Sequence, residues 1–219
     1  MAFIRFLCVL IFVLANLACS DTPSQLAAPA ANMPVVIANS FAYPVGKKET
    51  VTQAKDKDEW YNAQDFGENS HLGEDWNKNT GGNTDCGETV YAIADGIVTF
   101  AQDAGPGWGN VVIIEHTLPS GEKVESLYGH MQEILKTDGI VKKRDQIGTV
   151  GNANGRYPCH LHLEVRTGDC PMWNQPGPGY SNERKGWVDP SDFIDKQRRQ
   201  NQNTRNPVAT APGSDKSHP

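Results

Sequence analysis

The sequence predicts a mainly β protein, a single domain built on an antiparallel sheet and preceded by an export signal and a flexible spacer. From residue 41 onward, short runs rich in β-branched and aromatic residues recur between turns rich in Gly, Pro, Asn and Asp. No stretch carries a long helical stripe of apolar residues. At 219 residues the chain is long enough for one domain with a sizeable core, or for two small ones.

Residues 1–18 are predicted to be a signal peptide. Arg5 precedes the apolar run 6–17, which is too short to span a bilayer as a helix but has the length of a signal-peptide core. The run ends in Leu-Ala-Cys, which resembles the bacterial lipobox, although Asn16 stands where that pattern has Leu, Val or Ile. We therefore expect an exported lipoprotein anchored through a lipid on Cys19. Ordinary cleavage nearby, which leaves a soluble secreted protein, is the alternative.

The rest of the chain divides by composition. We expect a flexible linker at 19–40, the domain at 41–195 and a disordered polar tail at 196–219. The chain has 20 basic and 26 acidic residues, and because phosphate contacts need clustered Lys and Arg, this balance argues against nucleic acid as a partner. We expect a monomer that meets a membrane only through the anchor at Cys19.

The strands of the domain are expected in a regular order. Between the turn sequences ADG, GPGWGN, LPSGE and GNANG lie runs typical of strands at 89–96, 97–102, 110–116, 123–131 and 161–166. Residues 131–139 have room for one or two helical turns, and residues 186–195 are expected to close the domain.

The domain holds Cys86, Cys159 and Cys170, and export permits a disulfide between two of them. Pairing of Cys159 with Cys170 would close a short loop, whereas pairing with Cys86 would join distant segments; the sequence does not choose. No CxxC spacing occurs, which argues against a zinc site made of cysteines.

The segment HLGEDW places His71 and Asp75 four residues apart, and Gly73 between them favours a tight loop. Imidazole and carboxylate are both normal zinc ligands. Taken alone the pair is weak evidence, because a surface His near an Asp is commonplace.

The segment CHLHLEV has the alternation of a strand. One face presents His160, His162, Glu164 and Arg166, and the other presents Leu161, Leu163 and Val165. The leucine face is predicted to be core, so the simplest interpretation is a polar outer face on which Glu164 has a surface role; the alternative is that Glu164 orients one of the imidazoles. Two imidazoles at adjacent positions of one face are nevertheless within reach of one metal ion or substrate group.

Other histidines add to this set. Tyr128 and His130 of LYGHM alternate onto one face of an expected strand, although a single strand histidine is more often structural than catalytic. His116 is interpreted as structural and His218, in the tail, as idle. Considered together, the clusters favour a hydrolytic zinc site, which takes three protein ligands, one open position for water, and further groups that handle protons.

HLGED, YGH and HLHLEV, in that order, resemble the lysostaphin-type zinc metalloendopeptidases, bacterial peptidoglycan endopeptidases with HxGxD and HxH motifs. VYAIADGIVTFA, GWGNVVIIEH, IGTVGNANG and WVDPSDFI are similar to the family too, so the resemblance covers residues 41–195. It implies an antiparallel β domain with a loop-walled groove, metal ligands at His71, Asp75 and His162, and catalytic histidines at His130 and His160. The loops 105–110 and 174–180 are expected to wall the groove, with Trp108 or Tyr180 packing on peptide or sugar.

The resemblance further implies a zinc-dependent endopeptidase that hydrolyses peptide cross-links of peptidoglycan in the cell envelope (periplasm or outer membrane) or after secretion. The alternative is an inactive module that binds peptidoglycan and activates another cell wall hydrolase; the complete set of site residues favours the enzyme. The sequence leaves open whether a D-alanyl cross-link or a glycine bridge is cut, and whether His130 or His160 is the general base.

Overall fold

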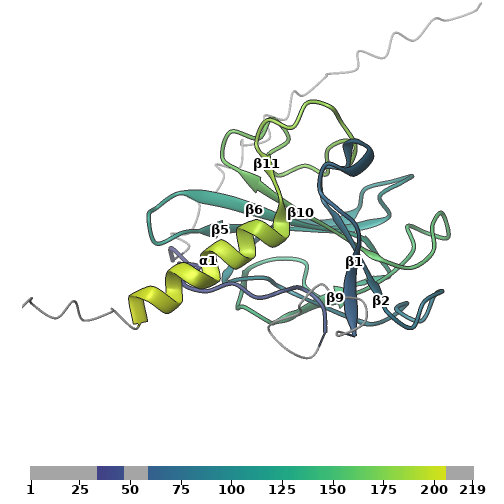
Figure 1. Ribbon diagram of the computed structural model, residues 1–219, viewed down its shortest axis with the longest axis horizontal. Helices are drawn as coiled ribbons and strands as arrows, with labels where there is room; N and C mark the ends of the chain where they lie inside the picture. Colours follow the sequence, from purple (N-terminus) through teal and green to yellow (C-terminus); the bar gives the residue numbers. More distant parts are fainter. Residues whose placement is uncertain (1–33, 47–58, 206–219) are drawn as a thin grey trace, which may run out of the picture. The chain divides into compact units, whose positions relative to one another are not determined.

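The centre of the sheet is a hairpin of β5 (Asn110–Thr117) and β6 (Lys123–Met131), two strands rich in Val, Ile, Leu and Tyr (Figure 1). Their antiparallel pairing follows from the short polar link between them, in which the N–H of Leu118 donates to the carbonyl of Glu122 across 2.8 Å. The computed structural model describes residues 34–46 and 59–205.

The sheet extends on both sides of this hairpin. Its order is β1-β2-β10-β6-β5-β4-β8, every neighbouring pair is antiparallel, and β11 pairs with β10. A smaller sheet has the order β3-β9-β7. The mainly β, antiparallel class is therefore confirmed. The remaining strands are β1 (Trp60–Gln64), β2 (Glu74–Lys78), β3 (Thr89–Tyr91), β4 (Gly96–Asp103), β7 (Glu133–Ile134), β8 (Ile140–Val141), β9 (Gln146–Thr149), β10 (Leu161–Thr167) and β11 (Trp187–Val188).

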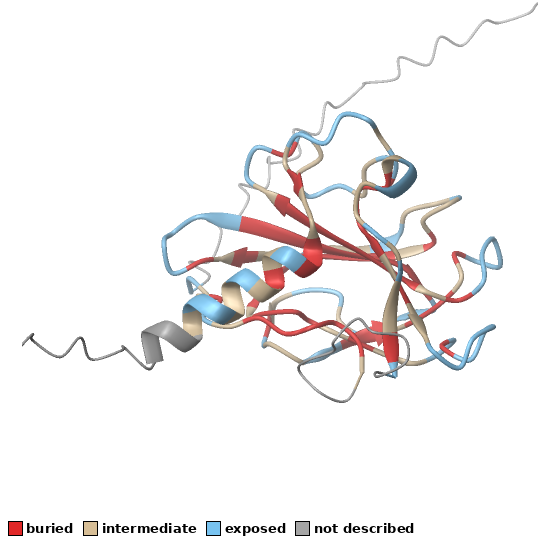
Figure 2. Ribbon diagram, in the orientation of Figure 1, coloured by how far each residue is buried: buried red, intermediate tan, exposed pale blue. Residues whose placement is uncertain are grey.

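The core lies on both faces of the central strands, which Figure 2 shows as the most buried part of the described chain. Leu161, Leu163 and Val165 pack with Val112 and Ile114 in the largest apolar cluster, as alternation along β10 predicts. Each such side chain contributes about 1.5–3 kcal/mol through burial. A smaller cluster on the opposite face is formed by Val111, Ile113 and Leu127.

A helix, α1 (Pro190–Arg205), ends the described chain and packs against the core through Ile194. Asp189 caps it, because its Oδ1 accepts the N–H of Asp192 across 2.9 Å. The helix corrects the expectation of a disordered tail, since residues 196–205 are helical. The capped start and the Lys, Gln and Arg that follow, all good helix formers, account for the extension.

The domain also begins earlier than expected. Ile37 forms a β-bridge with Thr117, and Ala38 is buried in the main cluster, so this part of the expected linker 19–40 packs on the domain. The predicted signal peptide and Cys19 lie outside the described residues. Among the helices within the described ranges, none is both long enough and apolar enough to cross a membrane.

Candidate metal centre and groove

The position of β10 between β2 and β6 brings the predicted site residues together. His162 on β10 lies opposite Asp75 on β2 and, on its other side, opposite the residue before His130 on β6. His160 directly precedes β10, and His71 lies in the turn between the short 3-10 helix η1 (Glu68–Ser70) and β2. Residues far apart in the chain thus meet at one end of three adjacent strands.

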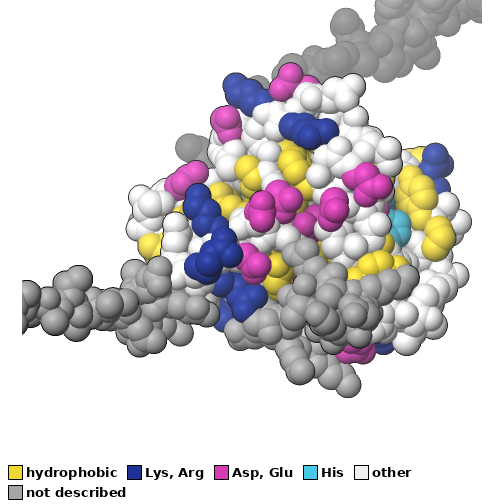
Figure 3. All heavy atoms as spheres, in the orientation of Figure 1, with side chains coloured by type: hydrophobic (Ala, Val, Ile, Leu, Met, Phe, Trp, Pro, Cys, Tyr) yellow, Lys and Arg dark blue, Asp and Glu magenta, His cyan; other side chains and the backbone are white. Residues whose placement is uncertain are grey.

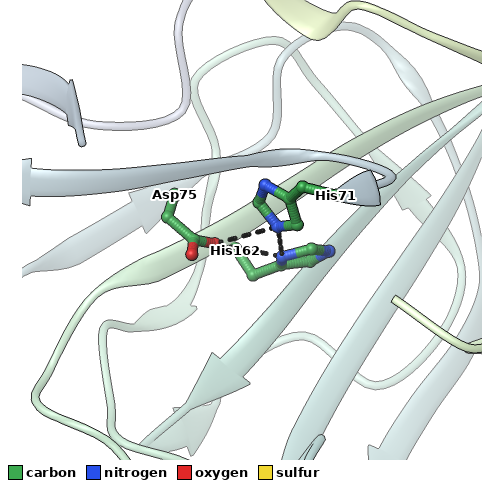
Figure 4. Close-up of side chains that lie close together, drawn as sticks. All are labelled: His71, Asp75 and His162. Carbon is green, nitrogen blue, oxygen red and sulfur yellow. Dashed lines mark hydrogen bonds and ion pairs between the residues drawn. The ribbon is translucent and has the colours of Figure 1, made fainter. Parts of the chain in front are cut away.

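Three ligand atoms converge at this point (Figure 4). His71 Nε2 lies 2.9 Å from His162 Nδ1, and Asp75 Oδ1 lies 3.1 Å from His162 Nδ1 and 3.4 Å from His71 Nε2. A tetrahedral zinc ion with bonds of about 2.0–2.1 Å separates its ligands by about 3.3 Å. The spacing and the donor set of two imidazoles and one carboxylate therefore fit a single zinc ion with one position left open.

Gly73 allows β2 to approach β10 this closely. A Cβ atom at this position would collide with the carbonyl oxygen of Leu163 and crowd His162. The glycine lies in the bend before β2, as expected, and there it serves the close packing of β2 against β10, while Asp75 sits on the strand itself.

Hydrogen bonds within the cluster shift the pKa values of Asp75 and His162. Burial opposes ionisation of Asp75, but hydrogen bonds from His162 and His71 outweigh it and hold the pKa of that carboxyl well below its usual range. Burial also opposes the charge on His162, yet hydrogen bonds to Asp75 and Glu164 raise its pKa to about 9. The cluster therefore stabilises a bound positive charge, which either a proton or a divalent cation can supply.

Glu164 is a buried partner of His162 and not the surface residue expected from the sequence. Its side chain is 0% exposed, and its Oε1 lies 3.1 Å from His162 Nε2. Because a carboxylate only accepts, Nε2 of His162 donates to Glu164, while Nδ1 faces Asp75 and His71 at the candidate metal position. Metal-binding histidines commonly hold their other ring nitrogen against a carboxylate in this way.

His130 and His160 line the same groove, and their tautomers are set by the main chain. Nδ1 of His130 lies 3.1 Å from the carbonyl oxygen of Trp108, and Nδ1 of His160 lies 2.8 Å from that of Pro158. Each Nδ1 is therefore the donor, which leaves Nε2 of the neutral ring as an acceptor. Burial, with the positive charges of His162 and His160, lowers the pKa of His130 to about 3. Two such rings are suited to moving protons.

His130 corrects one expectation from strand alternation. Tyr128 points into the core, where its hydroxyl accepts the N–H of Ile93 across 2.9 Å, whereas His130 lines the groove. The two side chains separate because His130 has a φ of 61°, a left-handed conformation that interrupts the alternation. Non-glycine residues held in this region cluster at functional sites.

A groove of about 360 Å³ opens over these rings. Trp108 and Tyr180, from the two loops expected to wall it, line the groove together with Tyr157 and Gln64, which no sequence motif marked. Tyr180 stacks on His71 with ring centroids 4.8 Å apart and donates its hydroxyl hydrogen to Gln64 Oε1 across 3.0 Å. On the face drawn in Figure 3, histidine surface is bordered by hydrophobic side chains.

A disulfide joins Cys86 to Cys159, the distant pairing of the two that the sequence left open, with Cα atoms 5.3 Å apart. It ties the long segment 76–88 to the residue before His160. Asn83 of that segment also accepts the N–H of Cys159 at its Oδ1 across 2.9 Å. The segment therefore braces the start of β10, on which the position of His160 depends.

Residues 69–174 match the family model described as Peptidase family M23. This range contains His71, Asp75, His130, His160 and His162. The match therefore covers the whole candidate site, and it ends before the wall residue Tyr180.

Individual proteins are similar over shorter stretches. Over 86 residues the chain is 37% identical to the DD-carboxypeptidase/endopeptidase Mpg of Neisseria meningitidis serogroup B. This stretch covers 39% of this chain and 19% of Mpg. Over 81 residues it is 35% identical to the murein hydrolase activator NlpD of Escherichia coli strain K12. This stretch covers 36% of this chain and 20% of NlpD. The matched stretch thus spans about one fifth of these relatives. The structure of lysostaphin from Staphylococcus simulans matches with 21% identity and a TM-score of 0.42, over 68% of this chain and 50% of that one.

Proposed function

We propose that the chain, whose residues 69–174 match the model of Peptidase family M23, is a zinc-dependent endopeptidase that hydrolyses peptide cross-links of bacterial peptidoglycan. One observation carries the proposal. Ligand atoms of His71, Asp75 and His162 all lie within 4.8 Å of one another, and the rings of His130 and His160 stand beside them in one groove.

In this mechanism His71, Asp75 and His162 would hold the zinc ion. Zinc bound there would polarise the scissile carbonyl and lower the pKa of a bound water to about 7. One of His130 and His160 accepts the proton of the attacking water at Nε2 and returns it to the leaving amine. The other ring stabilises the developing oxyanion.

The walls of the groove support a peptide substrate. Trp108, Tyr157 and Tyr180 line the groove and offer apolar ring faces on which a stretched peptide packs. We place the protein in the cell envelope, acting as a monomer on peptidoglycan peptides, either anchored through Cys19 or secreted.

The test is cleavage of purified peptidoglycan by the purified protein, with added zinc or with a chelator, and mass spectrometry of the released fragments. Zinc-dependent release is expected, and the fragment masses distinguish a D-alanyl cross-link from a glycine bridge. His162→Ala should lose both zinc and cleavage, whereas the matched variant His160→Asn should keep zinc and lose cleavage. Lack of release by the zinc-loaded protein, or release unchanged in His162→Ala, would refute the proposal.

A role as an activator is the second candidate, favoured by the 35% identity to a murein hydrolase activator. It predicts that the protein releases nothing by itself but accelerates another cell wall hydrolase. His160→Asn separates the two functions, because an activator should keep its stimulation in this variant and an endopeptidase should lose its cleavage.

A further inference from the structure

Arg166 is a buried cation on the same face of β10 as His162, and its side chain is 0% exposed. Its Nε donates to Glu164 Oε2 across 2.7 Å, and Nη2 lies 2.6 Å from the same oxygen. On the other side its terminal nitrogens donate to the main-chain carbonyls of Met172, Gln175 and Pro176. These contacts give four hydrogen bonds in addition to the ion pair with Glu164.

Glu164, the carboxylate to which Arg166 donates, also contacts His162 of the candidate metal centre. Glu164 receives Arg166 at Oε2 and His162 Nε2 at Oε1, so one buried carboxylate joins the two side chains. Trp187 Nε1 donates to Oε2 as well, across 2.8 Å. With its acceptors filled from three directions, Glu164 has one orientation, and the plane of the His162 imidazole follows from it.

The three carbonyls to which Arg166 donates belong to a loop that reaches the groove. The loop that Arg166 holds continues into residues 178–180, which form one wall. Further along the loop, Gly177 accepts the indole N–H of Trp108 across 2.9 Å, and Gly179 accepts the N–H of Leu72 across 2.9 Å. The loop is thus hydrogen-bonded to Arg166 at its start and to Leu72, the residue next to His71, further along.

We propose that Arg166 is a positioning residue that couples the metal centre to the substrate groove. Through Glu164 it orients the His162 ring, and through the three carbonyls it holds the wall that carries Tyr180. A lysine at this position keeps the positive charge, but it lacks the planar guanidinium with which arginine binds Glu164 and the three carbonyls at the same time. The inference rests on the proposed function in taking His162 as a zinc ligand.

The test compares Arg166→Lys, Glu164→Gln and a control, Glu125→Gln, in the full-length protein. Glu125 is a matched control because it is also buried, accepts the N–H of Asn174 in the same loop across 2.8 Å and lies 4.0 Å from Arg166 Nη1, but does not contact His162. Zinc affinity is measured by competition with a chromogenic chelator, and the mobility of the loop by the rate of chymotrypsin cleavage after Trp173 or Tyr180. Urea unfolding establishes that each variant is folded.

Arg166→Lys should weaken zinc binding about 10–100-fold and accelerate loop cleavage, and it should raise KM for a peptide substrate. Glu164→Gln, which is isosteric, should weaken zinc binding to a similar extent. Glu125→Gln should bind zinc as the wild type does. A folded Arg166→Lys protein with wild-type zinc affinity would overturn the inference, as would equal weakening in Glu125→Gln. Zinc affinity is measured without any cleavage of peptidoglycan, so a wild type that binds zinc but cuts nothing contradicts only the proposed function.

Discussion

His130 and His160 lie with their ring centroids 4.7 Å apart, and each donates its Nδ1 proton to a main-chain carbonyl. Because the acceptors belong to the backbone, substitution of a neighbouring side chain does not remove them. The two rings are therefore held in the same tautomer by the fold itself, and Nε2 of each is left to exchange protons, that of His160 at 3.7 Å from Asp75 Oδ1.

Replacement of either ring by asparagine should separate catalysis from folding. We expect His130→Asn and His160→Asn each to lower kcat about 10²–10⁴-fold, the usual contribution of a general acid or base. Asparagine tolerates the φ of 61° at position 130, so the midpoint of urea unfolding should stay near that of the wild type. His130→Val, whose branched side chain resists this φ, should unfold at lower urea. A fully active His130→Asn enzyme would exclude His130 from the chemistry.

Zinc should stabilise the folded protein through the candidate ligands. A ligand that binds only the folded state adds about 2.7 kcal/mol at 100 times its Kd, so Tm should rise with zinc concentration. Asp75→Ala should abolish the rise, whereas the control His160→Asn should retain it. Differential scanning calorimetry in chelator and in graded zinc measures this, and an equal rise in Asp75→Ala would speak against the ligand set.

The disulfide should contribute to stability through the length of the loop that it closes. Cys86 and Cys159 are separated by 73 residues in the chain. A cross-link over a loop of this size adds about 4 kcal/mol by restricting the unfolded chain. The double variant Cys86→Ser with Cys159→Ser should therefore unfold at clearly lower urea. In Cys170→Ala, reductant should still lower the midpoint as in the wild type, since Cys170 is a free buried thiol. A midpoint unaffected by reductant would rule out this contribution.

His116 should make stability depend on pH. The ring lies away from the groove, with Nε2 2.7 Å from Ser126 Oγ and Nδ1 2.9 Å from the carbonyl of Asp95, and burial lowers its pKa to about 4. An unfolded histidine titrates near about 6.5, so between these values the unfolded state binds more protons. The contribution of His116 is therefore full above about pH 6.5 and is lost as the pH falls towards about 4.

The measurement is urea unfolding of the wild type and His116→Asn at pH 7 and pH 5. The wild type should lose about 2 kcal/mol more than the variant between these pH values. Comparison with the variant removes the effects of the other buried groups, among them Glu125, whose pKa burial raises to about 7. Equal losses in the two proteins would show that His116 keeps an ordinary pKa.

Local patterns in the sequence predicted what depends on local structure. Alternation along β10 correctly assigned Leu161, Leu163 and Val165 to the core, because a strand places every second residue on one face. The resemblance drawn from HLGED, YGH and HLHLEV is confirmed by the match to the peptidase family. The roles of the site residues stay predictions until variants are measured.

Features set by distant segments were not predictable in this way. Glu164 is buried among His162, Arg166 and Trp187, and Trp187 lies 23 residues further along the chain, so no pattern near residue 164 marks the burial. The left-handed backbone at His130, within β6, is not signalled by the residue type, because a histidine ordinarily continues a strand. The choice of Cys86 over Cys170 as the partner of Cys159 likewise depends on how segment 76–88 packs.

The central claim is that His71, Asp75 and His162 hold one zinc ion while His130 and His160 remain free for proton transfer. Zinc content per chain, measured by inductively coupled plasma mass spectrometry on the wild type, Asp75→Ala and His160→Asn, tests it most directly. The account predicts one zinc ion in the wild type and in His160→Asn, and a large loss in Asp75→Ala. Zinc retained in full by Asp75→Ala, or lost from His160→Asn, would contradict it.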